Sequence, residues 1–371
     1  MKKVWMSLLC LMLCLTVLMP ASFATGKEAA DEIMNEVSAT TFTVVHTGDI
    51  NAKLENDGKS IGFAKLASFV EACAEKYPTL LLDSGNALAD QDGKVISVME
   101  NTQYTAGAIG TRDAALGIER LQELSARANY PLLCANWLMM DGDLLWDPYA
   151  IVEVGNVKVG VIGLIDPEIK ELYPEHTELC NVYDPAPIAN IYYEEMAAQG
   201  CTYYIALTSL GYDGEHTPRT LGAKCPWLNL ILDSNTTEET ALDLGELVSA
   251  NSGVIIFNLL PDFKQVGVMD ITTGTQDGMN QLLPDVFTAQ DLAELPGNAR
   301  IADLVAEDYV EPGEEGFESN GNITETQPGV EVNESKNTMM IYFACFGAII
   351  AATAGIIIYI TKKPAKKNEK K

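Results

Sequence analysis

Basic residues and histidines are scarce in this chain of 371 residues. It has 24 Lys and Arg against 52 Asp and Glu, a formal net charge of −28, and only three histidines. Nucleic acids and anionic lipid surfaces are bound by clustered Lys and Arg, which neutralise phosphates. The composition therefore excludes a nucleic-acid partner and favours partners that are neutral, cationic or protein.

Cysteines are few and irregularly spaced. Cys10 and Cys14 fall in the first apolar run and Cys345 in the last, which leaves five others: Cys73, Cys134, Cys180, Cys201 and Cys225. That odd number fits neither paired CxxC zinc ligands nor a dense disulfide framework. At most two disulfides can form, and we expect buried free thiols at most of the five positions.

Two long apolar runs lie near the ends of the chain. Residues 1–24 have Lys2 and Lys3, an apolar stretch and then Ser22-Phe23-Ala24, which is typical of a cleaved signal peptide. Residues 339–360 contain no charge and would span about 33 Å as a helix, the thickness of a bilayer core. The tail 362–371 is basic, so the positive-inside rule places it in the cytoplasm. We expect a single-pass plasma-membrane protein, attached through a transmembrane helix at 338–361, with its N-terminal domain extracellular.

The expected membrane helix has small residues at a spacing of four. Gly347, Ala351 and Gly355 would lie on one face, and such a face lets two helices approach closely. The spacing suggests a weak homodimer, although Ala and Gly are also simply common in membrane helices.

Between the two ends, the composition predicts one folded domain and one acidic linker. Residues 25–41 form a short N-terminal segment, and residues 42–310 alternate β-branched runs with helical patterns, as in α/β or mixed sandwich proteins. Residues 311–337 are acidic, without periodicity, and read as a disordered stalk. Strands are expected at 42–46, 79–82, 157–163, 203–207, 228–232, 254–257 and 266–271, and helices at 61–76, 118–128 and 188–199.

Polar turns follow several of these strands in a recognisable order. The segments are 42–51, 62–66, 80–86, 110–117, 206–211 and 230–237. They resemble, in that order, the LHTNDxH, GGxAKL, LLLDAGD, GNHEFDYG, ALSHLG and LIIGGHSH segments of the 5′-nucleotidase family, whose N-terminal domain is a calcineurin-like metallophosphoesterase. The resemblance covers about residues 42–275 and implies an α/β (α+β) domain, a four-layer αββα sandwich.

The family holds two divalent metals through side chains in these segments, and the resemblance locates the corresponding positions here. They are occupied by Asp49, Asn51, Asn86, Thr111, Ser209, Asn235 and Thr237, with Arg112 in place of the catalytic histidine. The alignment of the last pair, Asn235 and Thr237, can shift by one residue. Only Asp49 keeps the ligand type of the family. Neutral amides and hydroxyls are poor ligands for zinc or manganese, so we expect neither a bound metal nor another cofactor.

The altered positions leave two main interpretations of function, beside unrelated roles such as that of a cell-envelope structural protein. The first is a catalytically degenerate cell-surface member of the family, a binding or scaffold module for an unknown extracellular protein or small-molecule ligand. The second is a residual phosphoric-monoester hydrolase that uses Asp49 and Arg112. Only about 40 residues separate Ile271 from the acidic stalk, so we do not expect the family's second, nucleobase-stacking domain.

Individual site residues also have alternatives. Asp49 either caps the turn after the first strand or binds a lone cation. Arg112 is either solvated or salt-bridged, or it binds an anion through its planar fork. The four neutral residues are expected to hydrogen-bond one another and close the old cleft: Asn51, Asn86, Ser209 and Asn235.

Overall fold

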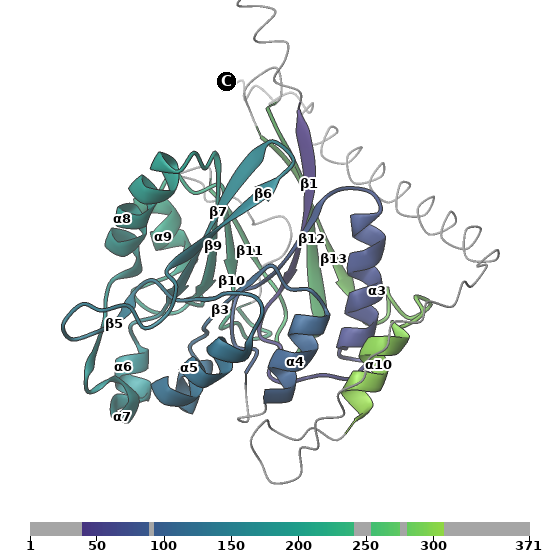
Figure 1. Cartoon of the computed structure of the whole chain (residues 1–371), viewed down its shortest axis with the longest axis horizontal. Helices are drawn as coiled ribbons and strands as arrows, with labels where there is room; N and C mark the ends of the chain where they lie inside the picture. The colour runs from purple at the N-terminus through teal and green to yellow at the C-terminus, as the bar shows by residue number, and fades with distance from the viewer. Residues whose placement is uncertain (1–38, 89–92, 241–253, 275–279, 308–371) are drawn as a thin grey trace, which may run out of the picture. The chain divides into compact units, whose positions relative to one another are not determined.

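Two β-sheets pack face to face, and helices cover the outer side of each (Figure 1). This computed structural model describes residues 39–88, 93–240, 254–274 and 280–307. The predicted signal peptide, stalk, membrane helix and basic tail lie outside the described residues. Within the described residues no helix has the length and apolar character needed to cross a membrane.

The first sheet has six strands in the order β13-β12-β1-β2-β3-β4. β1 to β4 are parallel, whereas β12 is antiparallel to both β1 and β13. Their bounds are β1 Thr40–Thr47, β2 Thr79–Asp83, β3 Ala106–Ala108, β4 Leu132–Leu133, β12 Gln265–Thr273 and β13 Gln281–Thr288. The central strand β1 pairs Val44 with Leu80 on one side and with Met269 on the other.

The second sheet has five strands in the order β11-β10-β9-β7-β6, all parallel except β6. Their bounds are β6 Tyr149–Val154, β7 Val157–Ile165, β9 Tyr203–Ser209, β10 Leu230–Asp233 and β11 Ile255–Asn258. A separate antiparallel pair joins β5 (Trp137–Met139) to β8 (Cys180–Val182).

Strand alternation creates three apolar layers. In β1, Phe42 and Val44 face the second sheet, while Val45 faces the helices of the first. In β9, Ile205 faces the first sheet and Ala206 the helices of the second. Successive side chains of a strand point to opposite faces, so these buried strands need apolar residues on both.

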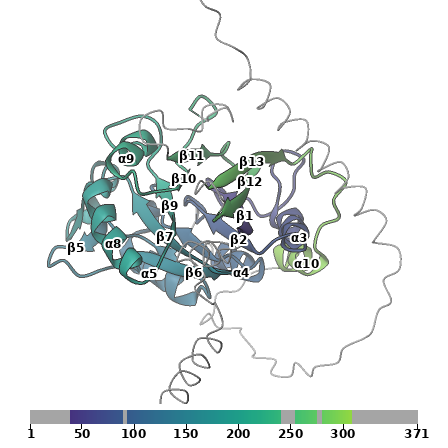
Figure 2. The same cartoon turned by 90° about the horizontal axis from the view of Figure 1, so that it is seen from above.

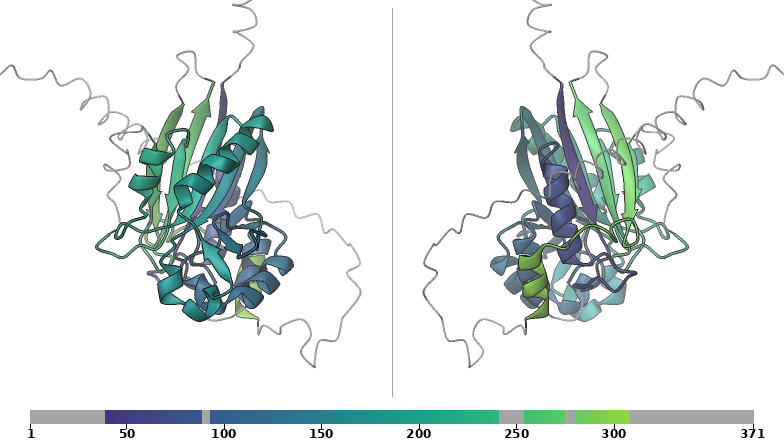
Figure 3. Two further views of the ribbon diagram at one scale, coloured as in Figure 1. Left: turned by 90° about the vertical axis from the view of Figure 1, so that its left-hand side faces the viewer. Right: turned by 90° about the vertical axis from the view of Figure 1, so that its right-hand side faces the viewer.

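Helices form the two outer layers. One group covers the first sheet: α3 (Phe63–Ala74), α4 (Gly93–Asn101), α5 (Ile118–Arg127) and α10 (Ala299–Ala306). The second sheet is covered by α8 (Pro185–Ala198) and α9 (Pro218–Lys224). Figure 2 shows α8 and α9 on one side of the sheets and α3 and α10 on the other, and the right-hand view of Figure 3 shows α3 and α10 lying over the first sheet. The expected four-layer αββα order is therefore confirmed.

Short elements follow β3 and β7. They are the 3-10 helix η2 (Asp113–Leu116) and the helices α6 (Ile169–Leu172) and α7 (Pro174–Thr177). All five cysteines of the described domain are free thiols, four of them buried and Cys73 partly so. Burial raises the pKa of Cys134 to about 12, so this thiol is inert at neutral pH. The prediction of free thiols is confirmed.

Candidate functional site

The loops that follow β1, β2, β3, β9 and β10 meet at one edge of the sandwich, where the parallel strands end. Four of the predicted site residues have left-handed backbone there: Asp49 (φ 50°), Asn51 (φ 52°), Asn86 (φ 61°) and Asn235 (φ 64°). Asn and Asp tolerate this conformation best among non-glycine residues. These residue types therefore serve the turns themselves, apart from any chemistry.

Asp49 lies at the centre of the site and is 1% exposed. Its Oδ1 accepts hydrogen bonds from Asn86 Nδ2 at 2.7 Å and from the backbone N–H of Asn235 at 3.1 Å. Its Oδ2 accepts from the backbone N–H and the hydroxyl of Thr236, at 2.9 and 2.8 Å. The carboxylate thus joins the loops after β1, β2 and β10, which is a structural role.

Arg112 covers this carboxylate from the solvent side. Its Nη1 lies 3.8 Å from Asp49 Oδ1, and its side chain is 40% exposed. Nη1 also donates to Asn51 Oδ1 at 3.1 Å, and Nη2 donates to the carbonyl of Thr236 at 3.4 Å. The backbone N–H of Arg112 donates to Asn86 Oδ1 at 2.8 Å. The guanidinium is therefore salt-bridged, as one of the two interpretations from sequence proposed.

Ser209 closes the other side of the site through Thr111. Its hydroxyl accepts from the backbone N–H of Thr111 at 2.9 Å and donates to the Thr111 hydroxyl at 3.1 Å. That hydroxyl donates in turn to the Ser209 carbonyl at 2.7 Å. Both residues are buried, so this pair fixes the loop after β3 to the end of β9.

Three further carboxylates are buried beneath the site. Asp83 accepts from the Thr47 hydroxyl and the Gly85 backbone, and Asp233 accepts from Thr208 and from the Leu210 and Gly211 backbones. Asp113 accepts from the backbone N–H groups of Asn86, Leu88 and Gly110 at 2.8–2.9 Å.

Burial disfavours the charged forms of these acids. It raises the pKa of Asp83 well above its usual range, that of Asp113 to about 6 and that of Asp233 to about 8. The carboxylates also raise one another's pKa, with Asp49 contributing to each. Hydrogen bonds to these buried acids therefore hold the loops in place, and ionisation of the acids would destabilise the folded state.

His46 is fully buried within β1, where its Nε2 contacts the Ser84 hydroxyl at 2.9 Å. Burial lowers the pKa of His46 to about 3. The imidazole is therefore neutral, and it lies within the strand rather than on a loop, as a structural residue does.

The residues present do not fit a pair of divalent metals. Both oxygens of Asp49 already accept two hydrogen bonds each, and the groups around them are an amide, a hydroxyl, backbone N–H groups and a guanidinium. Adjacent dications need anionic or imidazole ligands, and a fixed cation beside them is repulsive. Among the residues that the structure describes, no group of three His, Cys, Asp or Glu side chains could hold a metal ion.

The structure brings the predicted site residues together but corrects two details. Asp49, Asn51, Asn86, Arg112, Ser209 and Asn235 all lie at this edge. Thr237, however, is exposed and bonds Thr240 instead, while Thr236 occupies the site.

The four neutral residues do not hydrogen-bond one another through their side chains in the described contacts. Asn86 and the backbone of Asn235 form hydrogen bonds with Asp49. Asn51 forms them with Arg112 and Asp262, and Ser209 with Thr111. The expectation was wrong because the surviving charges are stronger partners for these amides than another amide is.

Three further residues belong to this network that the sequence did not predict: Asp113, Thr236 and Asp262. Asp113 follows Arg112 directly and accepts from three backbone N–H groups, and no sequence signal marks this role. Asp262 reaches Asn51 Nδ2 at 3.1 Å from the loop between β11 and β12, and no motif marks it.

No family model matches this chain. It is 26% identical over 303 residues to the trifunctional nucleotide phosphoesterase protein YfkN of Bacillus subtilis, an alignment that covers 73% of this chain and 20% of that protein. It is 30% identical over 154 residues to the snake venom 5′-nucleotidase of Crotalus adamanteus, covering 34% of this chain and 26% of the venom protein. The alignments thus span only about a fifth to a quarter of the length of these relatives.

Solved structures agree on the fold. The crystal structure of the calcineurin-like phosphoesterase YfkN from Bacillus subtilis superposes with a TM-score of 0.62 at 21% identity, covering 72% of this chain and 96% of that one. The relatives of this chain are therefore 5′-nucleotidases and calcineurin-like phosphoesterases, and its described domain has the fold of their N-terminal metallophosphoesterase domain.

Proposed function

We propose that this chain is a catalytically degenerate relative of the 5′-nucleotidases that acts at the cell surface as a binding or scaffold module. The observation that carries the proposal is the set of contacts around Asp49. Asp49 is the one carboxylate at the positions that correspond to the family's metal ligands. It already accepts four hydrogen bonds and forms an ion pair with the Arg112 guanidinium.

Chemistry supports this proposal in two steps. Metallophosphoesterases activate water through a bound metal, which lowers the pKa of that water to near neutrality. A site that offers one saturated carboxylate, amides and a fixed cation binds such metals poorly. Without activated water, phosphate-ester hydrolysis has no nucleophile at neutral pH.

The cellular setting in the proposal comes from the sequence. An export signal at residues 1–24 and a membrane helix at 338–361 would attach the folded domain to the outer face of the plasma membrane. The small residues Gly347, Ala351 and Gly355 would support a weak homodimer within the bilayer.

The proposal predicts that the purified full-length chain does not hydrolyse AMP or an aryl phosphate above background. Manganese, zinc, magnesium and calcium should each leave the rate unchanged, because none finds a suitable set of ligands. Phosphate release is measured alongside the Asp49→Ala variant. Turnover that disappears in this variant would contradict the proposal and favour a residual hydrolase using Asp49 and Arg112.

A second prediction concerns the Asn86→Asp variant, which restores one carboxylate at a family ligand position. Asn86 Nδ2 donates to Asp49 Oδ1 at 2.7 Å, so the substitution replaces a hydrogen bond with two carboxylates in contact. We expect the variant to melt several degrees lower, since a lost buried hydrogen bond costs about 1–3 kcal/mol. Calorimetry should still detect no micromolar binding of manganese. Tight binding by this single variant would mean that the rest of the metal site is intact.

A further inference from the structure

A cleft of about 420 Å³ lies away from the candidate site, between α5 and the segment that leads into β6. Gln122 and Ala126 of α5 line one side, and Leu144, Leu145, Trp146 and Asp147 line the other. Apolar and polar groups thus meet in one concave surface, which is typical of places where a ligand or an anchoring side chain binds.

Trp146 forms part of the wall of this cleft. The residue is 6% exposed, and its indole Nε1 has no hydrogen-bond partner among the described residues. The ring packs against Trp137, with centroids 5.1 Å apart, which fixes its position. The indole Nε1 is itself buried, so what Trp146 offers an occupant of the cleft is a fixed aromatic wall.

Exposed apolar side chains adjoin the cleft. We call Met140, Leu144 and Leu179 the apolar tip; they are 64%, 47% and 67% exposed. The backbone N–H of Met140 donates to the carbonyl of Leu179 at 3.1 Å, and Leu144 forms a β-bridge with Leu138 of β5. The tip is therefore one surface, and Leu144 belongs to both the tip and the cleft. Large exposed apolar side chains that gather in this way mark interaction sites.

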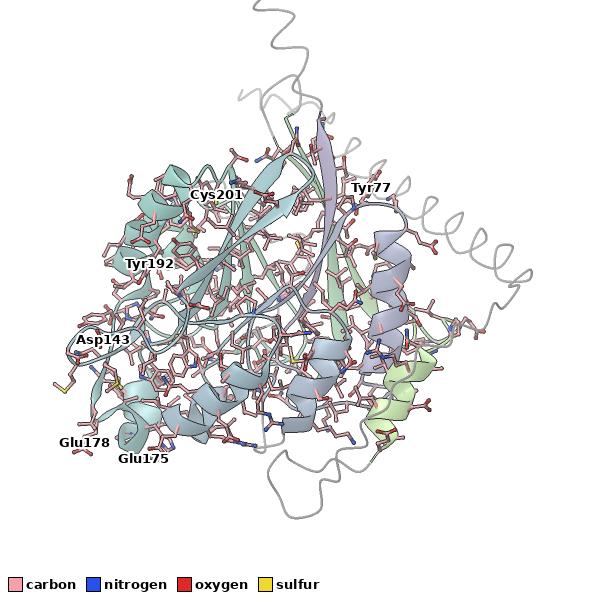
Figure 4. All side chains as sticks on the ribbon, viewed as in Figure 1. Tyr77, Asp143, Glu175, Glu178, Tyr192 and Cys201 are labelled. Atoms are coloured by element: carbon pink, nitrogen blue, oxygen red, sulfur yellow. The ribbon has the colours of Figure 1, made fainter. Side chains whose placement is uncertain are left out.

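Carboxylates surround the apolar tip. Segments 140–147 and 168–179 contain seven acidic residues, and their only basic residues are Lys170 and His176. Figure 4 shows three of the acids, Asp143, Glu175 and Glu178, at the same end of the domain. All three are exposed and attract cationic groups, and Glu175 already lies 3.9 Å from His176 Nε2.

We propose that the cleft and the apolar tip together bind a basic, amphipathic segment of another protein. Its apolar side chains would cover Met140, Leu144 and Leu179, and its Lys or Arg side chains would pair with Asp143, Asp147 and their neighbours. A second copy of this chain is disfavoured as the partner, because the seven acidic residues of one copy would repel the seven of the other. An anionic lipid surface is repelled by the same charges. The inference deepens the proposed function by naming the class of partner.

The test uses labelled peptides of about 14 residues, four helical turns, with Leu on one face and Lys elsewhere. Fluorescence anisotropy should report binding to the full-length chain, weakened by salt, and a matched peptide with Glu for every Lys should not bind. The double variant Met140→Ser, Leu144→Ser should raise the Kd about tenfold or more, since it removes two apolar contacts. Asp143→Lys should raise the Kd severalfold and reduce its salt dependence.

Two matched controls separate this surface from general stickiness. Ile191→Ser removes an equally exposed apolar side chain (57%) on α8, and Glu194→Lys reverses an exposed acid on the same helix. Both should leave the Kd unchanged. Equal binding of the two peptides, or equal loss in tip and control variants, would overturn the inference. A dimer of the full-length chain in ultracentrifugation that Met140→Ser abolishes would identify a second copy as the occupant and overturn it as well. Hydrolysis and metal assays do not enter this test, so it can fail while the proposed function holds, and the reverse.

Discussion

We expect the Asp49→Ala variant to melt about 10 °C below the wild type. The substitution leaves three donors of two loops without an acceptor, namely Asn86 Nδ2 and the backbone N–H groups of Asn235 and Thr236, whereas the Thr236 hydroxyl keeps the carbonyl of Leu259 as an acceptor. Each unsatisfied buried donor costs about 1–3 kcal/mol, and relaxation brings the total to about 3–5 kcal/mol. In a domain of this size, 1 kcal/mol corresponds to about 2–4 °C.

Thermal unfolding followed by circular dichroism measures this loss, and two variants calibrate it. Glu194→Ala removes an exposed acid of α8 and should leave the melting temperature unchanged. Arg112→Ala should cost about 1 kcal/mol or less, because the side chain is 40% exposed and its ion pair is screened by water. The fall in Asp49→Ala should be the same with EDTA present. A fall that appears only without the chelator would instead reveal a metal bound by Asp49.

The sequence was sufficient to predict the strands with long apolar runs, including the edge strand β11, but not the short or polar strands. Buried parallel strands are continuous apolar runs, and β1, β2, β7 and β9 were predicted within a few residues. β3, with the sequence Ala-Gly-Ala, has no such run, and it is a strand only because β2 and β4 pair with it. β13 has exposed and half-buried residues and a proline, so only its pairing with β12 defines it.

The sequence predicted the location of the candidate site but not the hydrogen-bond partners of its residues. Motif order located Asp49, Asn86 and Arg112, because strand ends carry the family's segments at fixed spacing. Which partner each amide takes depends on distances across loops, and the sequence does not contain those distances. Asp262 is 211 positions from Asn51, yet the two side chains are bonded. Thr236 rather than Thr237 faces Asp49 because Asn235 has left-handed backbone, which turns the loop after β10.

The buried acids should make the folded protein less stable as the pH rises. This is the opposite of the usual expectation for a carboxylate-rich protein, which is that stability falls as the pH is lowered. Burial raises the pKa of Asp113 to about 6 and that of Asp233 to about 8, whereas an unfolded Asp titrates at 3.8. The folded chain therefore binds more protons than the unfolded chain near neutrality. The stabilisation from these groups is complete below pH 4 and is lost as the pH rises through about 6 and then about 8.

We accordingly expect the melting temperature to fall by several degrees between pH 6 and pH 9, as measured by calorimetry at constant ionic strength. Buried thiols do not titrate in this window, since burial raises the pKa of Cys134 to about 12 and that of Cys225 to about 11. Asp233→Asn, which cannot ionise, should be less stable at pH 6 and should show a shallower slope above pH 7, while Asp83, whose pKa burial also raises well above its usual range, contributes to the slope that remains. Asp213→Asn changes an exposed acid and should keep the full slope. Two results would contradict this prediction: a melting temperature that stays level or rises toward pH 9, or an equal slope in Asp233→Asn and the wild type. Either would show that Asp233 is already ionised in the folded protein. The hydroxyl of Thr208 and the backbone N–H groups of Leu210 and Gly211 would then stabilise its charge.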